Sequence, residues 1–150
     1  MQLTAYTDFT LRMLMYLAVN GERLTTIADI AAAYRISEAH LTKVAHQLGV
    51  AGEIETVRGR KGGIRLRKPP AEINLGAVVR RTEADFALVP CFEAEASCAI
   101  QPCCALSGLL AKALEAFLAV LDRHTLADLV TPRARLARLL AVDRGAREWV

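Results

Sequence analysis

The sequence predicts a mostly helical protein that carries one small β-hairpin. Aliphatic residues recur at helical spacing along most of the chain, and a single glycine-rich stretch is flanked by two segments of alternating polarity. Hydrophobic residues make up 53% of the 150 residues but aromatic residues only 5%, so the core must consist of Leu, Ala, Val and Ile. The length fits one domain, or one domain with an appended helix.

Three amphipathic helices are predicted in the first third of the chain. In each, apolar residues recur three and four positions apart, and a side chain that can accept a hydrogen bond precedes the first turn. The predicted helices are residues 7–19 with Thr7 as the cap, residues 27–34 with Thr26 and Asp29 as a capping box, and a third helix from Ser37 to about residues 49–52. The tight turn between the second and third helices, and the polar outer face of the third, indicate a helix-turn-helix.

A β-hairpin is predicted directly after the third helix. Residues 54–57 and 64–67 alternate apolar and polar side chains, and residues 58–63 between them contain three glycines. A hairpin in this position is a wing, so the fold class is a winged helix-turn-helix over residues 1–82. A short helix over residues 75–82 completes this unit.

Positive charge is concentrated in the hairpin. The net charge is only +3, but residues 54–68 hold six Lys and Arg against one acid, Glu55, whereas residues 82–111 contain no Lys or Arg. This distribution favours contact with an anion, and a solvated charged hairpin is the alternative.

The helix-turn-helix and the basic wing together predict a site for double-stranded DNA. The polar face of the third helix can enter the major groove, the wing cations can reach phosphates or the minor groove, and hydroxyls near helix N-termini can lie close to phosphate. The candidate DNA-binding residues are Thr25, Thr26, Ser37, His40, Lys43, His46, Gln47, Arg58, Arg60 and Lys61.

A long helix is predicted over residues 105–123. Its apolar arc covers about half of the circumference, which is wider than one packing contact needs. We therefore expect one part to pack on its own domain and another on a second copy, in a homodimer; burial in a single core is the alternative. Residues 105–150 form the dimerisation helix and a C-terminal segment, with Thr125 capping a short turn at 126–130 and an Arg-rich segment following Pro132. No signal peptide or membrane span is recognised, so a cytoplasmic protein is expected.

All four cysteines lie within the loop predicted at residues 83–104. Six residues separate Cys91 from Cys98, and five separate Cys98 from Cys104. This spacing does not provide the paired Cys-x-x-Cys knuckles of a zinc ribbon but suits an iron–sulfur cluster. Cys104 also opens the long helix, whose dipole favours an anionic cluster. A metal-free thiol switch at Cys103 and Cys104 is the alternative.

Several segments resemble the NsrR and IscR family of winged-helix regulators, and the resemblance covers nearly the full chain. The matching segments are residues 1–4 with Thr7 and Asp8, residues 41–44, the wing at residues 57–66, Val89–Cys91, residues 98–104 and residues 121–129. The resemblance implies a homodimer with one iron–sulfur cluster, 2Fe–2S or 4Fe–4S, in each subunit. It implies as ligands Cys91, Cys98, Cys104 and Asp8 of the partner subunit. From the residues alone, Asp8 is a first-turn residue paired with Arg12.

The resemblance also implies a function. In cluster-biogenesis members the fourth ligand is a histidine three residues after the last cysteine, but Ser107 occupies that position here. The chain therefore matches the nitric-oxide sensors better, which implies a repressor that releases a palindromic operator and derepresses nitrosative-stress genes. An iron-status or cluster-status sensor of the same fold is the nearest alternative. The chain has no nucleotide-binding loop, catalytic triad or substrate domain, so an enzyme is not expected.

Overall fold

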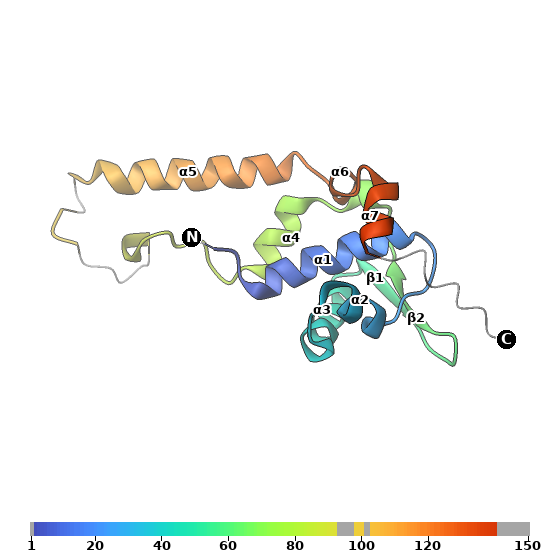
Figure 1. Cartoon of the computed structure of the whole chain (residues 1–150). Helices are drawn as coiled ribbons and strands as arrows, with labels where there is room; N and C mark the ends of the chain where they lie inside the picture. The colour runs from blue at the N-terminus through green and yellow to red at the C-terminus, as the bar shows by residue number, and fades with distance from the viewer. Residues whose placement is uncertain (1, 93–97, 101–102, 141–150) are drawn as a thin grey trace.

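The computed structural model describes residues 2–92, 98–100 and 103–140. Residues 2–82 and 126–140 lie together in one body, which we call the head, and the long helix of residues 105–122 projects from it (Figure 1). The predicted fold class, mostly helical with a two-stranded hairpin, is confirmed. The elements in chain order are α1 (Ala5–Asn20), α2 (Ile27–Tyr34), α3 (Glu38–Val50), β1 (Ile54–Val57), β2 (Gly63–Leu66), η1 (Pro70–Glu72), α4 (Leu75–Thr82), η2 (Pro90–Phe92), α5 (Ala105–Asp122), α6 (Leu126–Leu129) and α7 (Arg133–Leu139).

The core of the head is built around α1. The inner face of α1 contacts α2, α3 and α4, and each of these helices adds fully buried aliphatic side chains. These residues are Met13, Leu14 and Leu17 of α1, Ile30 of α2, Leu41 and Val44 of α3, and Val78 of α4. The aliphatic core predicted from the composition is therefore present, and it orients the outer face of α3 toward solvent.

The base of the hairpin is joined to the head by the buried side chains of Ile54 and Ile64 and by one backbone pair. β1 and β2 pair antiparallel, with Ile54 opposite Leu66 and Thr56 opposite Ile64. The N–H of Thr25 donates to the carbonyl of Ile64 at 3.0 Å, and the N–H of Ile64 donates back at 2.8 Å. The loop before α2 therefore forms an isolated β-bridge to the base of the wing.

Two predicted helix caps differ in the structure. α1 begins at Ala5, because the hydroxyl of Thr4 rather than that of Thr7 accepts the first-turn N–H, donated by Thr7 at 3.3 Å. Thr7 is buried and donates its hydroxyl to Thr82 of α4. Ser37 occupies the N-cap position of α3 but makes no side-chain capping bond. The predicted capping box of Thr26 and Asp29 is confirmed.

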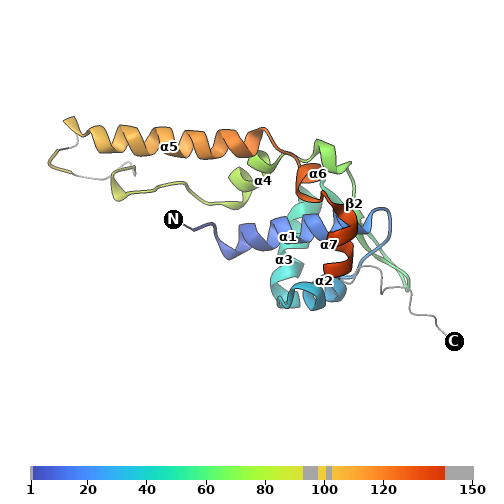
Figure 2. The ribbon, with the colours of Figure 1, turned by 45° about the horizontal axis from the view of Figure 1, so that its top comes forward.

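α5 extends well beyond the head in both views (Figures 1 and 2). No residue of α5 is buried, and Leu106, Leu109 and Val120 are 60%, 63% and 51% exposed. The alternative in which this helix is buried in a single core is therefore wrong. None of the described helices has both the length and the apolarity that crossing a membrane requires.

Candidate functional site

The outer face of α3 carries the polar side chains expected to read DNA. His40, Lys43, His46 and Gln47 are all exposed, because Leu41, Val44 and Leu48 turn the opposite face into the core. The ring of His40 also lies 5.8 Å from the ring of Phe9 on α1. The residues predicted on this helix are thus brought together on one accessible surface.

The wing tip holds three exposed cations, Arg58, Arg60 and Lys61, on a tight turn. Gly59 has a φ of +117°, which side-chain-bearing residues rarely adopt, and a Cβ at Gly62 would lie 2.9 Å from the carbonyl oxygen of Gly59. The ion pairs found within the described residues involve none of these three cations. Their charge is therefore available to phosphate.

The three hydroxyl residues predicted near phosphate have different surroundings. Thr25 is only 3% exposed, and its hydroxyl accepts from the side chain of Asn20. A direct contact of the Thr25 side chain with phosphate does not fit this burial; its backbone instead holds the base of the wing. Thr26 is exposed but donates its hydroxyl to Asp29 at 2.6 Å, and Ser37 is exposed at the start of α3.

The N-terminal half of α1 links to both helices of the helix-turn-helix. Asp8 accepts from Nε of Arg12 at 3.0 Å, and the Arg12 guanidinium lies 5.7 Å from the centre of the Tyr34 ring on α2. Burial raises the pKa of Tyr34 to about 12, although the Arg12 cation opposes this shift. The sequence pattern suggested the pairing of Asp8 with Arg12, but no local signal marked Tyr34 as a neighbour of Arg12 or His40 as a neighbour of Phe9.

The four cysteines are free thiols at the far end of the molecule from α6. Cys91 lies in η2, and Cys104 is the N-cap of α5 without a side-chain capping bond, as predicted for the start of the long helix. Both are half-buried, whereas Cys98 and Cys103 are exposed. Among the described residues, no three potential metal ligands lie close enough to hold an ion. The donor types fit an iron–sulfur cluster, but one subunit as described does not bring them together.

His124 is not near the cysteines. It is exposed after α5, with Nδ1 3.5 Å from the carboxylate of Asp128, and its carbonyl accepts from the N–H of Leu75. These contacts give His124 a structural role at the end of α5.

Comparison with known proteins gives a consistent result across the chain. Residues 3–132 match the Rrf2 family model, described as an iron-dependent transcriptional regulator. A Geobacillus kaustophilus protein named HTH-type transcriptional regulator NsrR is 56% identical over 147 residues, covering 97% of this chain and all of that protein. The Bacillus subtilis protein of the same name is 51% identical over 143 residues, covering 93% and 97%.

The solved structures agree with the fold. The structure of CymR, the global cysteine regulator of B. subtilis, matches with a TM-score of 0.70 at 26% identity, covering 87% of this chain and 97% of that one. The relatives are named as regulators rather than enzymes, as expected from the sequence. With the helix-turn-helix, the basic wing and the near full-length matches, the chain belongs to the Rrf2 family of transcriptional regulators.

Proposed function

We propose that this regulator is a cytoplasmic homodimeric repressor that binds a palindromic DNA operator and senses nitric oxide through an iron–sulfur cluster. The cluster would be held, one per subunit, by Cys91, Cys98, Cys104 and Asp8 of the partner subunit. The observation that carries the sensor assignment is the set of free cysteines at η2 and the start of α5, in a chain more than half identical to proteins named NsrR.

The DNA-binding part of the proposal is supported by the surface formed by α3 and the wing. His40, Lys43, His46 and Gln47 would face the major groove, where a glutamine amide can pair with adenine. Arg58, Arg60 and Lys61 would displace counterions from phosphates beside it. Thr26 and Ser37 would lie near the backbone at the starts of α2 and α3.

The cluster part of the proposal is supported by donor chemistry. Thiolates are the usual ligands of iron–sulfur clusters, and the N-terminus of α5 at Cys104 favours negative charge. When bound, such a cluster supplies iron that reacts with nitric oxide. Because the described residues of one subunit do not gather three ligands, a carboxylate from the partner would help to complete the site.

The contacts of α1 offer a route from this site to DNA. Asp8 pairs with Arg12, Arg12 lies over Tyr34 of α2, and Phe9 lies against His40 of α3. A change in what Asp8 binds would alter the contact between Asp8 and Arg12. It would also shift the first turns of α1 and, with them, the position of α3. This coupling would convert ligand exchange at Asp8 into a change in DNA affinity.

The dimer part of the proposal is supported by the exposed apolar face of α5. Leu106, Leu109 and Val120 are more than half exposed, which is unusual for large apolar side chains on one helix. A second copy of α5 would cover them and would place two α3 helices at the spacing of a two-fold symmetric operator.

The test is an anaerobic absorption spectrum with iron and sulfide analysis, before and after titration with nitric oxide, combined with DNA binding. We expect a coloured protein that loses its visible absorption and its DNA affinity on titration. A colourless, iron-free protein that still binds DNA would refute the cluster and direct attention to thiol chemistry at Cys103 and Cys104.

Adjacent cysteines supply a matched control. We expect Cys104→Ala to abolish iron retention and Cys103→Ala to keep it, since only Cys104 is assigned as a ligand. Asp8→Ala should weaken the nitric oxide response; an unchanged response would favour the iron-status or cluster-status sensor of the same fold.

A further inference from the structure

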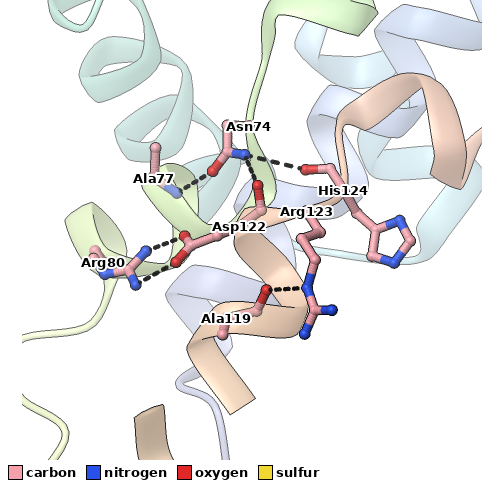
Figure 3. Close-up of polar contacts among 7 residues, drawn as sticks. All are labelled: Asn74, Ala77, Arg80, Ala119, Asp122, Arg123 and His124. Atoms are coloured by element: carbon pink, nitrogen blue, oxygen red, sulfur yellow. Dashed lines mark hydrogen bonds and ion pairs between the residues drawn. The ribbon is translucent and has the colours of Figure 1, made fainter. Parts of the chain in front are cut away.

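The C-terminal end of α5 is attached to the head by a compact cluster of polar contacts (Figure 3). We call this cluster the joint; it consists of Asn74, Gly76 and Arg80 on the α4 side and Asp122 and His124 at the end of α5. The Arg80 guanidinium makes a bidentate ion pair with the Asp122 carboxylate, in which Nη2 lies 2.8 Å from Oδ2. Bidentate pairs restrict orientation as well as distance.

Asn74 fixes both helices at once. Its Oδ1 accepts from the N–H of Ala77 at 3.0 Å and so caps α4. Its Nδ2 donates to the carbonyl of Asp122, the last residue of α5, at 2.7 Å and to the carbonyl of His124 at 3.4 Å. One side chain therefore joins the N-terminus of α4 to the C-terminus of α5.

Gly76 makes this close approach possible. It is buried, and a Cβ there would overlap Asp122 Oδ1 and lie 2.8 Å from Nη1 of Arg80. The ion pair therefore lies directly on the backbone of α4. The same arrangement holds the pKa of the Asp122 carboxyl below its ordinary value, mainly through the hydrogen bond from Arg80.

The segment after α5 anchors the joint in the core. The N–H of Leu75 donates to the carbonyl of His124 at 3.0 Å, and the N–H of Leu126 donates to that of Ile73 at 2.9 Å. Leu126 and Val78 are both fully buried. The backbone on both sides of the joint is thus tied to the core of the head, while the side chains of Arg80 and Asp122 stay partly exposed.

Beyond the joint, α5 is loosely supported. A cavity of about 550 Å³ lies between Leu114 and Phe117 of α5 and the segment that includes Thr4 and Glu83. α5 has 18 residues and is therefore about 27 Å long. A tilt of about 10° at the joint would move its far end by about 5 Å, which exceeds the rise of about 3.4 Å per base pair.

We propose that the joint determines which half-site spacing the dimer prefers on DNA, with Arg80 and Asp122 as positioning residues. This inference rests on the proposed function, in which two copies pair through α5. If the two α5 helices are held together, the angle between α5 and α4 fixes the separation of the two α3 helices. An added base pair moves a half-site by about 3.4 Å and rotates it by about 34°. A small change in angle at the joint therefore alters how well the two α3 helices fit the two half-sites.

The experiment measures DNA spacing directly. A half-site is first selected with the wild-type protein from random double-stranded DNA, and duplexes are then made with two inverted half-sites separated by spacers that grow one base pair at a time. Dissociation constants are measured for the wild type, Arg80→Gln, Asp122→Asn and the double variant. Arg123→Gln is the matched control, because within the described residues the Arg123 guanidinium bonds only the Ala119 carbonyl of α5 (Figure 3).

We expect the wild type to bind most tightly to the duplex with one particular spacer. In each single variant, the ratio between the dissociation constants for the other spacers and that for the preferred spacer should fall about fivefold. The double variant should lose no more than either single variant, because all three remove the same interaction. Affinity for a duplex with one half-site should be unchanged, and Arg123→Gln should keep the wild-type profile. Gly76→Ala should shift the preferred spacer, since Asp122 must move aside.

Two results would overturn the inference while leaving the proposed function intact. In the first, the wild type is a dimer that prefers one spacer, and Arg80→Gln and Asp122→Asn show the same dependence of affinity on spacer length as the wild type. The other is an equal loss at every spacer and on the single half-site, which would mean that the pair only stabilises the head. A wild type that is monomeric by light scattering and binds one and two half-sites equally would refute the proposed dimer itself, and the inference with it.

Discussion

Replacing Gly63 with alanine should loosen the attachment of the wing to the head. Gly63 begins β2, and a Cβ there would lie 2.8 Å from the carbonyl oxygen of Thr25 and 3.0 Å from its nitrogen. Both atoms belong to the backbone, so no side chain can rotate away. The clash would break the two hydrogen bonds between Thr25 and Ile64 that hold the base of the wing.

The size of the effect follows from those bonds. A net contribution of about 0.5–1.5 kcal/mol for each gives a loss of about 1–3 kcal/mol in the free energy of unfolding. For a chain of this length the melting temperature should fall by about 2–4 °C per kcal/mol. DNA affinity should fall as well, because the wing cations would no longer be held in a fixed position relative to α3.

The assay is urea unfolding followed by circular dichroism, combined with DNA binding at several salt concentrations. Gly49→Ala is the matched control, since a Cβ there meets nothing within 4 Å and alanine favours a helix. It should be neutral or stabilising by up to about 1 kcal/mol. If Gly63→Ala is as stable as the wild type, the reasoning about the wing base is wrong.

Three further predictions concern charge and packing. Burial opposes ionisation of Glu83, but hydrogen bonds, two of them donated by Thr4, outweigh it and hold its pKa below 4.5. A carboxyl pKa that is lowered by folding adds stability above pH 4.5, and this stability is lost as the pH falls. In Glu83→Gln, the free energy of unfolding measured with urea should therefore decrease less between neutral and acidic pH than in the wild type. An equal decrease in both proteins would count against this role of Glu83. Arg60→Gln should reduce the salt slope of DNA binding by about 0.9, and an unchanged slope would remove Arg60 from the phosphate contacts. Leu126→Ala should cost about 2–5 kcal/mol in unfolding experiments, because its side chain is fully buried, and a cost below about 1 kcal/mol would contradict its role as an anchor.

Local pattern was sufficient to predict most elements of the fold. The capping box of Thr26 and Asp29, the inward stripe of α3 and the alternating hairpin depend on residues a few positions apart, and the structure agrees with each. The start of α1 was predicted three residues late at its cap. Thr4 and Thr7 can both cap a helix, and the choice depends on Thr82, a contact 75 residues away.

The candidate site likewise has parts that the sequence predicts and parts that it does not. The basic wing and the polar face of α3 follow from residue type and periodicity, so the sequence alone predicts them. The burial of Thr25 does not follow, since its neighbours Ile64 and Gly63 come from the wing. The joint also left no local signal, because Asn74 and Arg80 meet Asp122 across more than 40 positions.

The sequence by itself therefore determined the winged helix-turn-helix, the family resemblance and the position of the thiols. Periodicity, capping and turn chemistry act within a few residues, so they can be detected along the chain. The tertiary structure decided which threonine caps α1, how the wing is attached and how α5 meets the head. These features depend on side chains that are distant in sequence and are brought together only when the aliphatic core around α1 forms.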